Sequence, residues 1–365
     1  MSSRQSRLTT FRAAISSRNV DGALVSHPSN RRYLTGFSAA DSSPGEPSAV
    51  ALVDSHSSIL LTAATNAPWA QAEAADWQIV AWQRPWTTTL AERIIASGWT
   101  TIGFEERAMS VAVFRTLQEA VGPRLQWVAV DDVLTSQRAT KDAHEMIALR
   151  AALALTDDVY AAVSRSIRPG QTEREVAWFI EREFRDRGGD GPAFATIVAA
   201  GPNAARPHHA SGDRRLQEGE PIIIDMGACV DGYNGDLTRT VCFGPAPDRL
   251  CEVYNAVNRA NRAAIASAGP GVPVKDVDGA ARTLIREAGF GDFFVHSLGH
   301  GLGLQVHEAP SLNESSNAVL QVGQVFTIEP GVYIPEWGGV RIEDVAVVID
   351  AGCSVLTTAA KQDLE

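Results

Sequence analysis

The chain has 365 residues, of which 21% are charged, and its formal net charge at pH 7 is −11. This length is enough for two ordinary domains, and the composition is that of a globular protein. The acidic balance argues against nucleic acid or an anionic membrane as the main partner, because both bind basic surfaces.

The compartment is predicted from two further features. The first residues, MSSRQSRLTTFRAAISSRNV, lack the apolar run of a signal peptide, and no later segment has the length of a membrane span. The four cysteines form no C-x-x-C pair, so we predict free and mostly buried thiols. These features predict a cytoplasmic protein.

The first 130 or so residues alternate β-like and helix-like runs. The β-rich runs are GALVS, AVALVD, SILLT, QIVAWQ and TTIGFEE, and helical composition lies between them at 66–75, 89–96 and 110–120. This alternation predicts an α/β domain with a mostly parallel sheet. No G-x-G-x-x-G follows any of these runs, so nucleotide binding has no support.

The pattern changes near residue 140. KDAHEMIALRAALALTDDVYAAVSRSI predicts one long helix that ends at a Pro-Gly pair, and Thr172 to Glu175 match a capping box for a second helix. Helical stretches at 249–267 and 274–288 then separate the β-like runs AFATIVAAG, PIIIDMGACV, LTRTVCFG, VFTIEPGVYI and GVRIEDVAVVI. Strands grouped with flanking helices predict an α+β domain. We place the two domains at 1–135 and 136–365.

Four acidic residues lie in or beside apolar β-like runs of the second domain. Asp225 ends a run of isoleucines, and Asp236 follows a turn-forming Asp-Gly-Tyr-Asn-Gly, a spacing that suits a hairpin. The two carboxylates could face each other; equally, Asp236 could cap the turn and Asp225 could pair with an arginine. Glu329 in VFTIEPGVYI and Glu343 in GGVRIEDVAVVI repeat the pattern.

Four buried acids would repel one another strongly unless cations lie between them. Together with His300, from VHSLGHGLGLQVHEAP, they form a ligand set of carboxylates and one imidazole. Such a set suits two hard or borderline divalent ions, such as Mn²⁺, Co²⁺ or Zn²⁺. The Leu-Gly alternation around His300 predicts a strand, with glycines that let the backbone pass close to metals and substrate.

With these motifs in place, the sequence resembles the pita-bread metallopeptidases, which include Xaa-Pro aminopeptidases, Xaa-Pro dipeptidases (prolidases) and methionine aminopeptidases. The resemblance runs over essentially the whole chain, through NRRYLTGF, PHHASG, DMGACVDGYNGDLTRT, HSLGHGLGLQVHEAP, TIEPGVY and GGVRIED. It implies an α/β N-terminal creatinase-like domain followed by an α+β C-terminal pita-bread catalytic domain.

The resemblance also implies a role for each residue. Asp225 would bind one metal, Asp236 and Glu343 would bridge both, and His300 and Glu329 would complete the second. Mn²⁺ is the favoured ion, with Co²⁺ or Zn²⁺ as alternatives. His208 and His307 match the two imidazoles that face the substrate, and His296 matches a further histidine near the site that is not a ligand. His209 would be an exposed neighbour.

A mechanism follows from this ligand set. Ions held by these residues would supply hydroxide for attack on the scissile carbonyl, His307 or His208 would donate to the tetrahedral intermediate, and Glu329 would shuttle the proton to the leaving nitrogen. An apolar notch should hold the proline ring. Its candidate walls are Tyr233, Tyr333 and Trp337, which could equally be core residues.

Proline-containing small peptides are the expected substrates, and aminopeptidase P-type activity is favoured. The prolidase alternative is weakened because Ser311 stands where some prolidases carry an arginine for the substrate carboxylate. Methionine aminopeptidases generally lack the first domain. Metal-free creatinase-like hydrolases and non-catalytic relatives have lost ligands that this chain keeps. Arg341 should orient Glu343 or Asp344, and Arg31 or Arg32 could reach a site across the homodimer that the family suggests.

Overall fold

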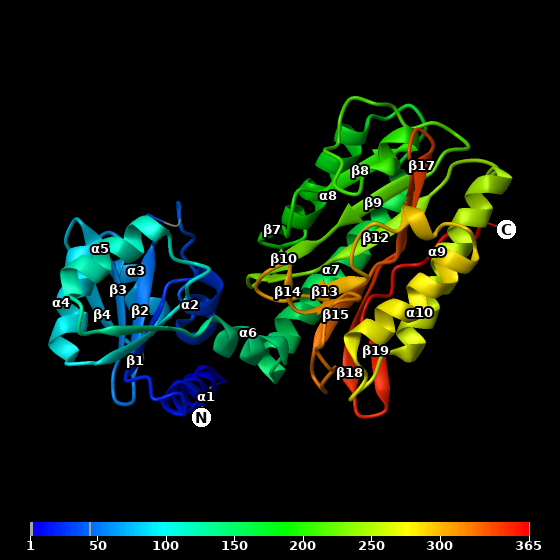
Figure 1. Cartoon of the computed structure of the whole chain (residues 1–365). Helices are drawn as coiled ribbons and strands as arrows, with labels where there is room; N and C mark the ends of the chain where they lie inside the picture. Colours follow the sequence, from blue (N-terminus) through cyan, green and yellow to red (C-terminus); the bar gives the residue numbers. More distant parts are fainter. Residues whose placement is uncertain (1–2, 44, 365) are drawn as a thin grey trace. The chain divides into compact units, whose positions relative to one another are not determined.

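The computed structural model describes residues 3–43 and 45–364. The chain divides into two compact units, 1–138 and 139–365, which run from blue to cyan and from teal to red in Figure 1. No helix within the described ranges is long and apolar enough to cross a bilayer. All four cysteines are free thiols, with Cys242 buried and the other three half-buried.

Unit 1 is built on a six-stranded sheet in the order β4-β3-β2-β1-β5-β6. Its strands are β1 (Gly22–Val25), β2 (Ala49–Asp54), β3 (Ser58–Ala63), β4 (Gln78–Trp82), β5 (Thr101–Phe104) and β6 (Gln126–Ala129). Its helices are α1 (Ser3–Ser16), α2 (Pro28–Thr35), α3 (Ala67–Glu73), α4 (Trp86–Ser97) and α5 (Val111–Val121), and α6 (Asp131–Ala139) runs to the division between the units.

The sheet of unit 1 is more mixed than predicted. The pairs β3–β4, β1–β5 and β5–β6 are parallel, whereas β1–β2 and β2–β3 are antiparallel. The connection 55–57 between β2 and β3 is too short for a crossover, so it turns the chain back as a hairpin. The core of the sheet includes Leu24, Leu52, Leu61, Ile94 and Leu117.

Arg31 is buried inside unit 1, contrary to the prediction that it could reach across a dimer. Its guanidinium pairs with Asp41 at 2.9 Å and donates to Ser48 and to the carbonyls of Ala39 and Ala49. The side chain is fully buried. A buried guanidinium needs such partners, because it has lost its contacts with water. Arg31 therefore stabilises its own domain.

Unit 2 contains four long helices and several short sheets. The helices are α7 (Ala143–Ser166), α8 (Glu173–Asp186), α9 (Asp248–Ser267) and α10 (Val274–Glu287), with 3₁₀ turns η1 (Gly201–Ala205) and η2 (Gly291–Phe293). The strands of its first half are β7 (Gly191–Pro192), β8 (Ile197–Ala200), β9 (Ile222–Met226), β10 (Ala228–Val230), β11 (Tyr233–Asn234) and β12 (Leu237–Val241). Those of its second half are β13 (Gly299–Gly301), β14 (Glu308–Leu312), β15 (Val325–Ile328), β16 (Gly331–Ile334), β17 (Gly338–Arg341), β18 (Asp344–Ile349) and β19 (Gly352–Val355).

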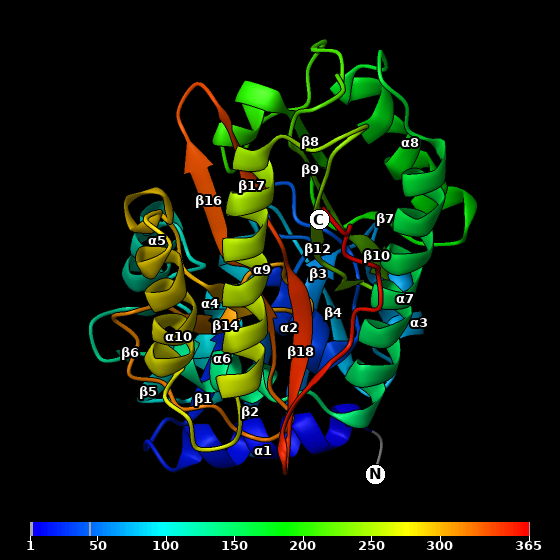
Figure 2. The same cartoon turned by 90° about the vertical axis from the view of Figure 1, so that its right-hand side faces the viewer.

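The helices cover the strands in two pairs. In Figure 1, α7 and α8 lie along β8, β9 and β10, and the shared core includes Val176, Ile180, Phe184, Ile222 and Ile224. Figure 2 shows α9 and α10 side by side, and α9 packs against β15, β16 and β17. Each pair of helices packs one apolar face against its own group of strands. The strands therefore lie between the two helix pairs.

Helix starts in unit 2 follow the sequence signals. The side chains of Asp142 and Thr172 each accept a hydrogen bond from the backbone N–H three positions on, and the side chains of Glu145 and Glu175 accept one from the backbone N–H of the cap residue. Both are complete capping boxes, so the prediction for Thr172 is confirmed.

Candidate functional site

The four acidic residues are placed where strands end or break. Asp225 lies in β9, opposite Thr238 of β12, and Asp236 comes directly before β12, so the predicted hairpin return is present. Glu329 falls in the break between β15 and β16, and Glu343 in the break between β17 and β18. Where a strand is interrupted, a side chain is freed from the sheet's alternation and can turn toward a shared centre.

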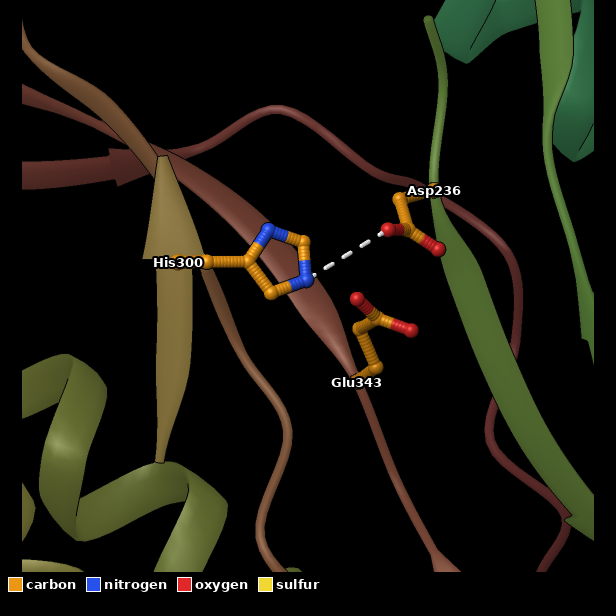
Figure 3. A group of neighbouring side chains, drawn as sticks. All are labelled: Asp236, His300 and Glu343. Atoms are coloured by element: carbon orange, nitrogen blue, oxygen red, sulfur yellow. Dashed lines mark ion pairs between the residues drawn. The ribbon is translucent and has the colours of Figure 1, made fainter. Parts of the chain in front are cut away.

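Three of these side chains meet at one point. Figure 3 shows Asp236, His300 and Glu343 converging from three separate chain segments, and their potential ligand atoms all lie within 4.8 Å of one another. His300 Nε2 is 3.8 Å from Asp236 Oδ2 and 3.2 Å from Glu329 Oε1. The Nδ1 atom of His300 donates to the Gly301 carbonyl, so Nε2 is the nitrogen that faces the carboxylates.

The clustered charges shift one another's protonation. Burial raises the pKa of Asp236 well above its usual value, and the nearby carboxylates of Glu343 and Asp225 raise it further. Burial likewise raises the pKa of Glu343 to about 8. Burial opposes the charged forms of His300 and Glu329 too, but their mutual hydrogen bond and attraction prevail, with the pKa of His300 at about 9 and that of Glu329 at about 2.

The donor set fits divalent metal ions. Asp225 Oδ1 and Glu343 Oε1 are buried and accept no hydrogen bond from the described residues. A buried carboxylate oxygen without a partner is costly, and a cation offers such a partner without any further donor. Carboxylates combined with one imidazole are the ligands that Mn²⁺, Co²⁺ and Zn²⁺ accept.

Asp225 is linked to a buried polar chain. Arg341 Nη2 donates to Asp225 Oδ2 at 2.6 Å, and Arg341 Nη1 donates to the Tyr333 hydroxyl at 2.7 Å. His296 Nδ1 donates to the Ser297 carbonyl, so its Nε2 accepts from Tyr333 at 2.9 Å. Both nitrogens of His296 are thus engaged, and its contact with Tyr333 makes it a support for the site.

Among the described contacts Arg341 reaches Glu343 only through Thr238, whose hydroxyl accepts from Arg341 Nε at 3.1 Å, and it makes no direct bond to the side chain of Glu343 or Asp344. Arg239 takes that place, because it pairs with Asp344 at 2.9 Å and donates to the Glu343 carbonyl. Thr238 donates its hydroxyl to Glu343 Oε2 at 2.8 Å. The alternative in which Asp225 pairs with an arginine is therefore also realised, together with the convergence of the carboxylates.

A cavity of about 1060 Å³ opens onto these groups, and it brings His208 and His307 into the same lining as the five predicted ligands. The His307 ring stands edge-on to His300, with 4.3 Å between ring centroids. Both His208 and His307 are exposed at the cavity surface, whereas Asp236 is only 4% exposed. The histidines therefore face the space that a substrate would enter.

His209 is held firmly, contrary to the prediction of an exposed neighbour. Its Nε2 lies 2.8 Å from Glu173 Oε2, and the Glu173 side chain is fully buried at the start of α8. Sequence reasoning assigned Glu173 only to a helix start, so this pair was missed. A histidine beside His208 and an acidic residue at the first helical position were the available signals.

Two of the three aromatic residues predicted as walls of the proline notch, Tyr233 and Trp337, lie outside the cavity lining. Tyr233 is 8% exposed, belongs to the core around α7, and donates its hydroxyl to Glu145 at 3.2 Å. Trp337 packs against the core of α9 and α10, with Arg249 over its ring. Tyr333 does line the cavity. Tyr233 and Trp337 are therefore core residues, which is the alternative that the sequence left open for them.

The glycines around His300 serve strand packing. A Cβ at Gly299 would lie 2.0 Å from the Thr327 carbonyl oxygen, and one at Gly301 would lie 2.0 Å from that of Ala309. The predicted single strand is two short ones, β13 and β14, with a register shift at His300 and Gly301. The close approaches within the protein are made to neighbouring backbone, and Gly299 also lines the cavity, so the approach to metals and substrate stays a prediction.

Comparison with known sequences extends this picture. Residues 147–350 match the family described as metallopeptidase family M24, and residues 7–140 match the creatinase/prolidase N-terminal domain. The chain belongs to metallopeptidase family M24. The predicted fold, a creatinase-like domain followed by a pita-bread catalytic domain, is confirmed, and membership of family M24 implies divalent metal ions.

Three similar proteins illustrate the M24 match. An Xaa-Pro dipeptidase of Lactobacillus delbrueckii subsp. lactis is 34% identical over 94% of both chains. The structure of an Xaa-Pro dipeptidase from Bacillus anthracis is 30% identical, covers 98% of this chain and 99% of its own, and has a TM-score of 0.92. An X-Pro aminopeptidase from Thermotoga maritima is 32% identical, with coverage of 97% and 98% and a TM-score of 0.89.

Proposed function

We propose that this protein is a metallopeptidase that hydrolyses Xaa-Pro bonds and releases the N-terminal residue, as an aminopeptidase P-type enzyme does. The observation that carries the proposal is the meeting of four carboxylates and His300 in one cavity lining that also holds His208 and His307. The names of the relatives, Xaa-Pro dipeptidase and X-Pro aminopeptidase, support the same bond specificity.

The metal centre we propose holds two divalent ions, with Mn²⁺ as first choice and Co²⁺ or Zn²⁺ as alternatives. Asp225 would hold one ion, Asp236 and Glu343 would hold both, and His300 and Glu329 would hold the other. When bound, such ions supply hydroxide near neutral pH and polarise the scissile carbonyl. The two unpartnered oxygens, Asp225 Oδ1 and Glu343 Oε1, support this arrangement.

The protein's own groups would perform the remaining steps. His208 and His307, both in the lining, would donate hydrogen bonds to the carbonyl oxygen as negative charge develops on it. Glu329 would carry the proton to the leaving nitrogen. Its Oε1 already accepts from Thr327 at 3.2 Å and faces His300, so the proton would travel on Oε2. His296, through Tyr333, would keep the wall of the site in place.

The main alternative is an Xaa-Pro dipeptidase, the activity named for two of the relatives. A dipeptide leaves a free carboxylate next to the scissile bond, which calls for a nearby cation. Ser311 lines the cavity where some prolidases carry an arginine, and Arg341 is already engaged by Asp225 and Tyr333. This favours substrates longer than dipeptides.

The test is hydrolysis of Ala-Pro and Ala-Pro-Ala by protein reconstituted with Mn²⁺. Cleavage of Ala-Pro-Ala at the Ala-Pro bond is the expected result, and cleavage of the dipeptide alone would establish the alternative. Protein that binds none of Mn²⁺, Co²⁺ and Zn²⁺ would instead be a metal-free creatinase-like hydrolase or a non-catalytic binding protein.

Two further expectations belong to this proposal. We expect residues 1–135 to form the creatinase-like N-terminal domain and residues 136–365 the catalytic domain, and the enzyme to act as a homodimer in the cytoplasm. Since Arg31 is enclosed, any contact across such a dimer would have to come from another residue, such as the half-buried Arg32. Analytical ultracentrifugation of the purified protein would test the dimer.

A further inference from the structure

A buried asparagine of helix α9 lies behind two of the proposed ligands. Asn261 is fully buried, and its Nδ2 donates to the Ile328 carbonyl at 3.0 Å and to the Ile342 carbonyl at 3.5 Å. These two isoleucines come directly before Glu329 and Glu343 in the chain. One side chain of α9 therefore holds the backbone that leads into both glutamates.

The peptide units that lead into the two glutamates are held at both ends. The Glu329 N–H donates to the Leu298 carbonyl at 2.8 Å, and the Glu343 N–H donates to the Thr238 carbonyl at 3.1 Å. Because a peptide unit is planar, fixing its carbonyl and its N–H together fixes the whole plane, including the Cα atom that follows. Asn261 thus helps to set the point from which each glutamate side chain starts.

Lys361 determines which way the Asn261 amide faces. Its Nζ donates to Asn261 Oδ1 at 2.8 Å, and an ammonium group has no acceptor to offer in return. The amide oxygen must therefore point toward the lysine, which leaves both N–H bonds of the amide for the two isoleucine carbonyls. An amide turned the other way would place its oxygen against those carbonyls and its NH₂ group against the cation.

The same ammonium group also supports the backbone after Glu343. Lys361 Nζ forms an ion pair with Asp344 Oδ2 at 2.7 Å, and Asp344 Oδ1 accepts from Arg239 Nη2 at 2.9 Å. Arg239 in turn donates to the Glu343 carbonyl. Both Asp344 and Arg239 are nearly fully buried, so salt in the solvent screens their contacts little. The backbone on both sides of Glu343 is therefore connected to Lys361.

The segment that follows β19 brings Lys361 to this place. Its Thr358 and Ala359 N–H groups donate to Asp157 of α7 at 2.6 and 3.1 Å, and its Ala359 carbonyl accepts from Arg239 at 2.7 Å. The Lys361 side chain is only 23% exposed. Because the segment is anchored just before it, Lys361 is held in place and differs from a freely moving surface lysine.

We propose that Asn261 and Lys361 are a pair of positioning residues that fixes the backbone of Glu329 and Glu343 and thereby sets the geometry of the metal centre. The proposal rests on the proposed function, because it needs both glutamates to be ligands. Asn261 and Lys361 both lie outside the cavity lining, so the pair should act on metal binding and turnover and leave substrate binding unchanged. Residues behind metal ligands typically change metal affinity or activity by roughly 10–100-fold.

The experiment compares wild type with Lys361→Met and Lys361→Arg. Methionine keeps an unbranched chain without the cation, whereas arginine keeps both the charge and the N–H donors. In Lys361→Met we expect the Kd for Mn²⁺, measured by electron paramagnetic resonance of the free ion, to rise about tenfold. The kcat for Ala-Pro-Ala should fall about tenfold while KM changes less than about twofold, and the visible spectrum of the Co²⁺ form should change.

Two comparisons test whether the effect belongs to the pair. Lys361→Arg should recover most of the Mn²⁺ affinity and of kcat, and Lys275→Met, which changes an exposed lysine of α10, should behave as wild type. Asn261→Leu should resemble Lys361→Met, and the double variant should lose little more than either single variant, because the two residues act through one contact. Circular dichroism checks that each variant is folded, and if Asn261→Leu does not fold, the Lys361 variants decide.

The outcomes separate the pair from the proposed function. A wild type that binds none of Mn²⁺, Co²⁺ and Zn²⁺ would overturn both. A wild type that binds metal but cleaves no peptide would overturn the proposed reaction alone, since Mn²⁺ affinity and the Co²⁺ spectrum still test the pair. If Lys361→Met matches an active wild type in Mn²⁺ affinity, spectrum and kcat, the positioning role is overturned, even if that variant unfolds at a lower urea concentration. Losses that multiply in the double variant would show that the two residues do not act as a pair.

Discussion

Glu173 should be a positioning residue for the segment that carries His208, and Glu173→Gln tests this. Glu173 Oε1 accepts from the Ala200 N–H and from Asn203 Nδ2, both at 2.9 Å. Its Oε2 accepts from the Gly212 N–H at 3.0 Å and faces His209 Nε2 at 2.8 Å. A glutamine has one oxygen, so in either orientation its NH₂ group must face at least one backbone N–H donor, that of Ala200 or that of Gly212.

The size of the effect follows from these contacts. At least one hydrogen bond to a charged acceptor is lost, so the free energy of unfolding should fall by about 1.5–3 kcal/mol or more. Urea unfolding at pH 7 measures this, and kcat/KM for Ala-Pro-Ala should fall with it as the His208 segment loosens. Glu183→Gln is the matched control on the same helix, because that carboxylate pairs with exposed arginines and should cost at most about 1 kcal/mol.

The same carboxylate predicts a pH dependence. Burial alone would raise the pKa of Glu173, but hydrogen bonds from Asn203, Ala200, His209 and Gly212 lower it below its usual value. A depressed pKa in the folded state stabilises the protein above the unfolded value of about 4.3, and that stabilisation is lost as the pH falls through the folded pKa. The difference between wild type and Glu173→Gln should therefore shrink below about pH 4. A variant within 1 kcal/mol of wild type at pH 7 would refute the reasoning.

Four further variants address the site. Asp236→Ala or Glu343→Ala should abolish hydrolysis and reduce Mn²⁺ bound to the purified protein; substantial remaining turnover would contradict a centre built on both residues. Tyr233→Phe should leave kcat/KM unchanged, because the ring is outside the cavity, and should lower the unfolding free energy by about 1 kcal/mol through loss of the bond to Glu145. Tyr333→Phe removes a partner from both His296 and Arg341, so kcat should fall about tenfold while KM changes little; an unchanged kcat would show that this chain of hydrogen bonds does not position the site.

The cluster of proposed ligands was predictable because three of its members break a local rule. Asp225, Glu329 and Glu343 are acids within apolar runs, and such residues are retained where they have a specific partner. The meeting of Asp236, His300 and Glu343 agrees with that prediction. The capping boxes were readable for a similar reason, because their partners are only three residues apart.

The contacts that the sequence did not predict join residues that lie far apart along the chain. Spacing cannot tell that Arg341 contacts Asp225, 116 residues earlier, or that Arg239 contacts Asp344. Sequence patterns did not predict the helices α1, α2 and α6 or the strand β6. These elements have weak patterns of their own, and for the helices stability comes mostly from packing against the rest of unit 1. Tyr233 could be core or cavity on composition alone, and only the fold decides between them.

The division of the ligands between the two halves of unit 2 has a consequence for how activity is acquired. Asp225 and Asp236 belong to the strands under α7 and α8, whereas His300, Glu329 and Glu343 come from the strands that follow α9 and α10. Contacts such as that between Thr238 and Glu343 span 105 residues, and contacts of such long range form late in folding. During refolding, catalytic competence should therefore return after helix content, because neither half holds a complete ligand set by itself.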